Sequence, residues 1–354
     1  MKKNLYILAV ACLALASCSN DETVATRHDP NEISFRALNN NITRSADITS
    51  FTTTPFMVRA VKGSETYFSE TQYTYDSGTS SWTSTTKHYW PSDDAQLTFH
   101  AHAPISNAQI THTADESTFV VTPSATAGEQ VDLVYATTTG KKSTSSAGVV
   151  LTFGHVESKV IIQLKNSNSN LKITANKVEI GNVKNNGTYT MGTGWDLTGA
   201  TNTSYPQSFS GTEYTTATQA GDDMILIPQT LTNATTYASG EVGAAFEGSY
   251  IKVDLKIQNS TSPYAYVVGD ADHFVTALFP LPATAWTSGY KYIYTVDLAG
   301  GGYFPTNTSA GTGNALDPIL DDVEIKFVTV TVSDWTPYDS DSSTDGNQPI
   351  DVGM

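Results

Sequence analysis

Two histidines on one short apolar segment have the type and spacing of metal ligands. His100 and His102 alternate within residues 97–103, and Asp93 and Asp94 come shortly before them. Imidazole and carboxylate groups are common ligands of Zn²⁺, and side chains two apart on a strand share a face. The solvent face of any half-buried strand alternates in the same way, so we expect no metal site here.

A second pair, His155 and Glu157, could transfer protons, because these side chains are common general acids and bases. Residues that alternate along a strand usually only line one surface, and we interpret His155 as structural. The acidic runs 222–223 and 321–324 lack the spaced oxygen ligands and the glycine of a calcium-binding loop.

The common motifs of catalytic sites are missing from the sequence. It contains no Gly-x-Ser-x-Gly, no His-Glu-x-x-His and no phosphate-binding glycine loop between a strand and a helix. We therefore expect no catalytic residue, no cofactor and no metal, and we predict that the protein is not an enzyme.

The chain has 354 residues and is acidic, with a formal net charge of −16. No basic run is longer than Lys141-Lys142. This excludes nucleic acid as a partner, because binding to phosphates needs clustered cations. With 39% hydrophobic residues, the chain is long and apolar enough to form two folded domains.

Short apolar or alternating segments lie between clusters of Gly, Asn, Ser, Thr and Pro. No segment keeps a 3.6-residue apolar period for three turns, so the sequence predicts an all-β fold. In residues 97–103, Leu97 and Phe99 would face a core, whereas His100 and His102 would face water. The predicted strands are residues 56–61, 97–103, 131–135, 149–164, 171–180, 224–227, 249–257, 264–268, 274–279, 290–298 and 323–332.

The N-terminus has the pattern of an export signal. Two lysines precede an apolar stretch at residues 5–16, which is too short to span a bilayer. The sequence Leu15-Ala16-Ser17-Cys18 then resembles the lipobox of bacterial lipoproteins. We expect residues 1–17 to be a lipoprotein signal peptide and Cys18 to carry the lipid, whose acyl chains would hold the protein on the outer membrane.

The cysteines agree with this interpretation, because the chain has only Cys12, inside the apolar signal, and Cys18. The exported chain therefore has no disulfide, and its stability must come from core burial.

A series of short motifs follows the lipobox through nearly the whole chain. They are Glu32-Ile33-Ser34-Phe35, Thr43-Arg44-Ser45-Ala46, residues 97–104, residues 131–136, residues 150–160, Ile225-Leu226-Ile227-Pro228-Gln229, Gly289-Tyr290-Lys291-Tyr292 and Val330-Thr331-Val332-Ser333-Asp334-Trp335. In this order they resemble the fimbrillin-like family, the pilins of lipoprotein-derived type V pili. The resemblance implies two tandem β-sandwich domains of the transthyretin-like, Greek-key type.

We expect the boundary between these domains near residue 165, where an Asn-Ser run at residues 166–170 interrupts the apolar pattern. The expected divisions are a signal peptide (1–17), a propeptide with a removable first strand (18–44), an N-terminal domain (45–165), a C-terminal domain (166–335) and a polar tail (336–354).

The resemblance also implies a mechanism of assembly. In such pilins an Arg-specific surface protease cuts after an arginine that follows the first strand. Arg44 matches that position, so the processed chain would begin at Ser45. The departing strand would leave an apolar groove where Ile33, Phe35 and Ala37 had packed, and a strand of another subunit could fill it. Such a contact does not close on itself and produces a filament.

The sequence identifies the donor strand less clearly than it identifies the strand that would leave the groove. In the family it comes from the C-terminal region, but here the tail is mostly polar, and only Ile350 and Val352 form an alternating apolar pair. Three alternatives follow. This short segment is the donor, or residues 323–332 swing out, or the subunit accepts a strand without giving one.

The resemblance thus predicts a structural pilin of surface fimbriae that mediates adhesion. Its expected partners are other pilin subunits, in a homo- or heteropolymer, together with outer-membrane lipid through Cys18 before processing and an Arg-specific surface protease. One alternative is a non-polymerising anchor or tip subunit. Another is a surface lipoprotein that stacks glycans on exposed aromatic residues such as Tyr67, Tyr73, Tyr75, Trp82, Tyr89 and Trp90.

Overall fold

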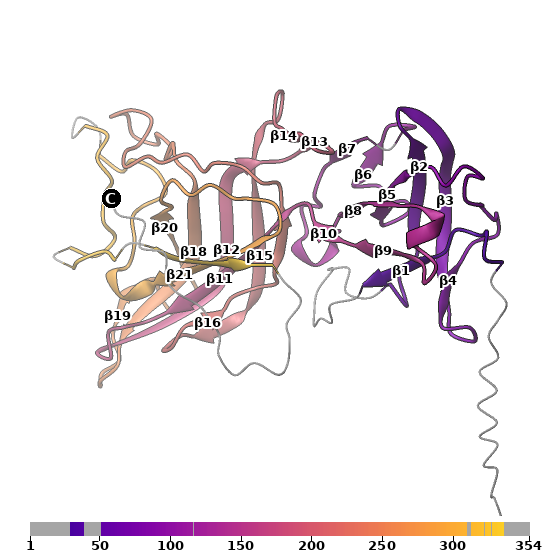
Figure 1. Ribbon diagram of the computed structural model, residues 1–354. Helices are drawn as coiled ribbons and strands as arrows, with labels where there is room; N and C mark the ends of the chain where they lie inside the picture. Colours follow the sequence, from indigo (N-terminus) through magenta and orange to yellow (C-terminus); the bar gives the residue numbers. More distant parts are fainter. Residues whose placement is uncertain are drawn as a thin grey trace, which may run out of the picture.

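The computed structural model describes residues 29–38, 51–115, 117–309, 313–321, 323–326 and 328–335. Within these residues the chain consists almost entirely of strands and loops (Figure 1), which confirms the all-β prediction. The helical segments described are short 3₁₀ turns, η1 (Ala127–Glu129), η2 (Lys142–Thr144) and η3 (Leu298–Gly300). In this part of the chain no helix has the length and apolar character needed to cross a membrane.

An eight-stranded sheet forms most of the N-terminal half, in the order β10-β8-β5-β2-β3-β4-β1-β9. Leu97 and Phe99 are both fully buried, as the alternation predicts. Side chains from β1, β2, β5 and β9 join one core, so the sheet wraps around it. The strands are β1 (Phe35–Leu38), β2 (Phe56–Lys62), β3 (Glu65–Asp76), β4 (Ser81–Thr83), β5 (Leu97–Ala103), β8 (Val134–Gly140), β9 (Val149–Thr152) and β10 (Gly154–His155).

The outer face of β5 is not fully exposed to water, and the prediction for His102 is wrong. Its side chain is only 1% exposed, because a hairpin of β6 (Ile110–His112) and β7 (Thr118–Val121) packs over it. The ring of Phe119 lies 5.1 Å from the ring of His102. His100 is half-buried, and its Nδ1 makes a 2.7 Å hydrogen bond with the hydroxyl of Tyr135.

A small sheet joins the two halves of the chain, in the order β14-β13-β7-β6. Strand β13 (Gly187–Thr190) pairs with β7 and with β14 (Gly194–Asp196). Buried residues from both halves, including Phe119, Leu133 and Ile227, share one core beside it. The junction is therefore packed as well as hydrogen-bonded.

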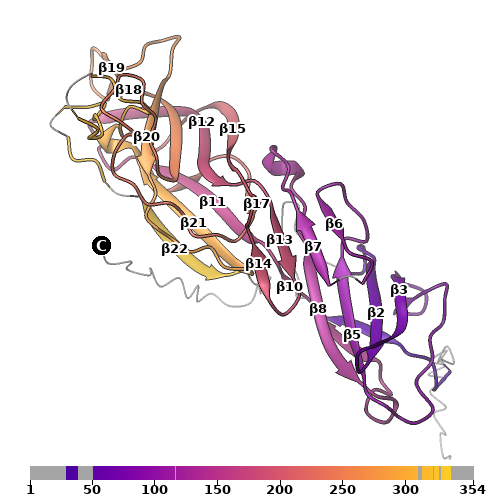
Figure 2. The same ribbon diagram turned by 90° about the horizontal axis from the view of Figure 1, so that it is seen from above.

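The C-terminal half is built around the largest core, to which two sheets contribute. The order in one sheet is β16-β11-β21-β22, with β17 also pairing β11, and in the other β15-β12-β18-β19, with β20 also pairing β18. The strands are β11 (Ser158–Lys165), β12 (Leu171–Lys184), β15 (Asn202–Glu213), β16 (Thr218–Gln219), β17 (Met224–Leu226), β18 (Tyr250–Asn259), β19 (Tyr266–Val268), β20 (Val275–Pro280), β21 (Tyr290–Asp297) and β22 (Thr329–Asp334). Figure 2 shows the two halves end to end.

The chain crosses between the halves earlier than expected. Residues 149–164 do not form one strand, because β9 and β10 belong to the N-terminal sheet and β11 pairs with β16, β17 and β21. Val160, Ile162 and Leu164 of β11 accordingly lie in the C-terminal core. A division at Val156 and Glu157 matches the sheets better than one at residue 165.

Candidate functional site

Strand β1 lies within the N-terminal sheet, between β4 and β9. It pairs antiparallel with β4 at Phe35 and Trp82, and parallel with β9 along Phe35–Leu38 and Val149–Thr152. Among the described residues, β9 pairs with no strand other than β1. Loss of β1 would therefore leave β9 without its neighbour as well as opening a gap beside β4.

The side chains of this segment fill the N-terminal core. Ile33 and Phe35 are 2% exposed and Ala37 is 6% exposed. The ring of Phe35 meets Tyr73 edge-on at 4.8 Å and Phe99 at 5.3 Å. Burial of a side chain as large as Ile or Phe stabilises a fold by about 1.5–3 kcal/mol. An empty groove here would expose a continuous apolar slot.

Hydrogen bonds extend this pairing toward the N-terminus. The backbone N–H of Ile33 donates to the carbonyl of His88, and the N–H of Val149 donates to Ser34, each at 2.8 Å. Lys87 also forms a 2.8 Å ion pair with Glu32, which raises the pKa of Lys87. The groove thus offers backbone donors and acceptors as well as apolar contacts.

Gly148 lets β9 approach this segment closely. Its φ is +91°, and a Cβ at this position would lie 3.2 Å from Oγ and 3.4 Å from the carbonyl oxygen of Ser34. A larger residue would strain the backbone and crowd the segment.

Several predicted site residues lie outside the described part of the chain. They are Cys18, Arg44, Ser45, Ile350 and Val352. Arg44 and Ser45 belong to residues 39–50, which connect β1 to Phe51 in the sequence.

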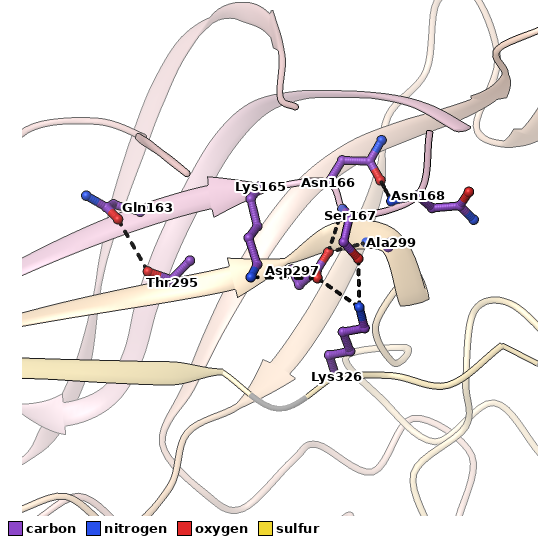
Figure 3. Close-up of polar contacts among 9 residues, drawn as sticks. All are labelled: Gln163, Lys165, Asn166, Ser167, Asn168, Thr295, Asp297, Ala299 and Lys326. Atoms are coloured by element: carbon purple, nitrogen blue, oxygen red, sulfur yellow. Dashed lines mark hydrogen bonds and ion pairs between the residues drawn. The ribbon is translucent and has the colours of Figure 1, made fainter. Parts of the chain in front are cut away.

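Strand β22 lies at the edge of its sheet. Contacts of Lys326 hold the chain just before this strand. Lys326 lies 3.4 Å from the carboxylate of buried Asp297, and Lys165 approaches it at 4.0 Å (Figure 3). Lys326 also donates a 2.8 Å hydrogen bond to the hydroxyl of Ser167. Asp297 further accepts bonds from the backbone N–H groups of Ser167 and Ala299.

The environment of Asp297 favours its charged form. Burial alone would raise its pKa, but the hydrogen bonds from Ser167 and Ala299 and the charge of Lys326 outweigh this effect and lower the pKa. The carboxylate therefore acts as an ionised anchor for the chain that enters β22.

A second contact holds the chain directly after β22. The Trp335 ring stacks on His155 with 3.8 Å between centroids and an interplanar angle of 5°. The N–H of Trp335 donates to the carbonyl of Gly289 at 2.7 Å. His155 Nδ1 in turn lies 2.9 Å from the buried carboxylate of Asp132. His155 thus positions an aromatic residue at the junction of the two halves.

Two further ionisable groups, Glu157 and Lys159, follow His155 closely in the sequence. Lys159 pairs with Asp223 at 2.8 Å, and its Nζ lies 5.8 Å from the centre of the Trp335 ring. Glu157 is fully buried and accepts a 3.0 Å hydrogen bond from the N–H of Leu133. Burial, and secondarily the charge of Asp132, raise the pKa of Glu157 well above its ordinary value.

The other sequence-based candidates have separate partners. Asp93 forms an ion pair with Lys62 at 2.8 Å, and Asp94 accepts hydrogen bonds from Ser143, so neither joins the two histidines of β5.

The aromatic residues considered for glycan stacking are not all exposed. Tyr73 and Trp90 are buried in the N-terminal core, and Trp82 packs against it. Tyr67 and Tyr89 are exposed, and the Tyr67 hydroxyl donates to the Tyr89 carbonyl at 2.8 Å. The six residues therefore do not form one exposed platform.

Comparisons with known proteins identify relatives of this arrangement. A family model described as fimbrillin-like matches residues 36–335. A fimbrial protein from Bacteroides vulgatus ATCC 8482 has a similar structure, with a TM-score of 0.58 and 16% identity over 86% of this chain and 100% of that chain. A candidate cell adhesion protein from Bacteroides ovatus ATCC 8483 has a TM-score of 0.49 and 17% identity over 87% of this chain and 99% of that chain. A comparison with curated proteins finds no match.

The raised pKa of Glu157 predicts a pH-dependent stability. The folded chain keeps a proton that the unfolded chain loses above the ordinary pKa of 4.5, so stability falls as the pH rises from there toward the folded-state pKa. Glu157→Gln keeps an acceptor for Leu133 and removes this titration. We expect a higher Tm at neutral pH and a flatter pH profile in thermal melts. A variant that is less stable than wild type at neutral pH with an unchanged profile would contradict the assignment.

The lowered pKa of Asp297 predicts the opposite dependence. Its contribution is present above the ordinary pKa of 3.8 and is lost as the pH falls through the folded-state value. Asp297→Asn should lower the unfolding free energy by about 1.5–3 kcal/mol at neutral pH, because a charged hydrogen-bond acceptor is lost. Urea unfolding of both proteins at neutral and acidic pH measures this, and the difference should shrink in acid. Asp270→Asn, at an exposed carboxylate, is the control and should change stability much less than Asp297→Asn.

Proposed function

The chain belongs to the fimbrillin-like family, and we propose that it is a pilin subunit of surface fimbriae, with a structural and adhesive role rather than an enzymatic one. The observation that carries the assembly mechanism is the internal position of β1, whose apolar face fills the N-terminal core.

In this proposal the subunit reaches the cell surface as an outer-membrane lipoprotein. The lipobox supports lipidation at Cys18 after removal of residues 1–17. Acyl chains on this residue would keep the precursor on the membrane until the link between Cys18 and the folded domains is cut.

An Arg-specific surface protease would then cut after Arg44, between β1 and the domain that begins at Ser45. This cut separates β1 covalently from the strands that surround it. The backbone groups of β9 and the apolar slot around Tyr73 and Phe99 then become available to a strand from another subunit. Because the donor and the groove belong to different surfaces, repeated exchange builds an open filament.

We propose the polar tail as the source of the donor strand, rather than β22. The ion pair of Lys326 before β22 and the stack of Trp335 after it both favour retention of β22 in its own subunit. Residues 336–354 follow this anchored strand, and 19 residues can extend to about 63–68 Å. Ile350 and Val352 would then enter the groove in place of two of the apolar side chains of β1.

The proposal predicts the N-terminus of the polymer. Protein sheared from the cell surface should begin at Ser45 and migrate as SDS-resistant multimers. Arg44→Ala should abolish the cut and leave lipidated monomers that begin at Cys18, as measured by N-terminal sequencing and intact mass.

Arg27→Ala is the matched control, because this arginine precedes β1 and a cut there would not separate β1 from the domain. It should leave multimers that begin at Ser45. Wild-type monomers that keep acylated Cys18 would refute the shaft role and leave an anchor subunit or a glycan-binding lipoprotein.

The proposed donor predicts a separate defect. Replacement of Ile350 and Val352 together by Asp should leave cleavage at Arg44 intact but abolish SDS-resistant multimers, because carboxylates cannot be buried in an apolar groove without a partner. Asp351→Asn changes a residue on the opposite face and should polymerise normally. Normal multimers of the double variant would instead favour β22 as the donor.

A further inference from the structure

Three side chains from different strands converge on the outer face of the N-terminal sheet. Glu70 belongs to β3, His102 to β5 and His112 to β6. One ligand atom of each lies within 4.8 Å of the other two. Oε1 of Glu70 is 3.5 Å from Nε2 of His112 and 4.0 Å from Nε2 of His102.

The orientation of His112 resembles that of a metal ligand. Its Nδ1 lies 3.1 Å from the carbonyl oxygen of Thr113. A carbonyl only accepts hydrogen bonds, so Nδ1 carries a proton and neutral His112 presents a lone pair at Nε2. That lone pair faces the carboxylate of Glu70. A backbone carbonyl that fixes the distal nitrogen in this way is the usual support of a metal-binding histidine.

The separations suit a shared metal better than a shared proton. A charge-assisted hydrogen bond between imidazolium and carboxylate spans about 2.7–2.9 Å. Two ligand atoms at 2.0–2.1 Å from one Zn²⁺ lie roughly 3.3 Å apart in a tetrahedron. The 3.5 and 4.0 Å separations are closer to the second arrangement, and the three ligand atoms, all within 4.8 Å of one another, would draw together to reach it.

Burial is graded across the three residues. The side chain of His102 is 1% exposed, whereas those of His112 and Glu70 are 23% and 31% exposed. The ring of Phe119 packs against both histidines and limits their movement. Glu70 and His112 therefore form the partly exposed side of the cluster, and His102 forms its buried side.

We propose that Glu70, His102 and His112 bind a divalent transition-metal ion, Zn²⁺ by the chemistry of its ligands, with water in the fourth position. The ion would fasten the β6–β7 hairpin to β3 and β5. Because β7 also pairs with β13, the same ion would stiffen the connection between the two halves of the subunit. This site is independent of strand exchange.

The test uses the full chain, purified in detergent and freed of metal with a chelator. Zn²⁺ is titrated against a chromophoric competitor, and thermal unfolding is recorded with and without the ion. We expect one tight equivalent of zinc and a higher Tm. Glu70→Gln and His112→Gln should each weaken binding by at least about tenfold and remove the Tm shift.

His273→Gln is the matched control, because His273 pairs with Asp270 on an exposed loop and should not affect binding. Circular dichroism verifies that each variant is folded, and both site variants alter partly exposed residues to favour this. X-ray absorption at the zinc edge should show two imidazole ligands. Absence of stoichiometric binding, or equal binding by wild type and both site variants, would overturn the proposal.

Discussion

The N-terminal half depends on an occupied position between β4 and β9. Strand β1 there contributes hydrogen bonds along one edge to β9, and Phe35 together with Ile33, two residues before it, fills the core. Neither contribution can be lost without leaving buried polar groups unpaired and apolar side chains exposed to water. Removal of this strand would therefore leave a groove with unmet backbone hydrogen bonds and exposed apolar surface.

The junction between the halves is held by packing, backbone pairing and charge together. The small sheet pairs β7 with β13, and Leu133 and Ile227 share one core beside it. The buried carboxyl groups of Asp132 and Glu157 interact electrostatically at this junction. Asp132 pairs with His155, whereas burial and, secondarily, the charge of Asp132 raise the pKa of Glu157.

The histidines illustrate how one residue type serves different ends in this fold. His155 supports Trp335 through a flat stack, and His100 bonds to Tyr135 on the outer face of β5. His102, two residues further along the same strand, is buried under the hairpin beside Glu70 and His112. Their roles differ because a different part of the chain packs against each of them: Trp335 against His155, Tyr135 against His100, and the β6–β7 hairpin against His102.

The sequence by itself determined the all-β class and the core face of β5, because the alternation of Leu97 and Phe99 is a local property of a strand. The fimbrillin-like family also followed from motifs along the chain. Only the tertiary structure showed that residues 149–164 divide between two sheets, that His102 is covered, and that Asp297 anchors Lys326. Glu70 and His112 carried no local signal for the proposed metal site, since they are 42 residues apart in sequence. Period-two patterns report which face of a strand is apolar, but strand order and the packing of a hairpin over a sheet arise from long-range contacts that no local pattern encodes.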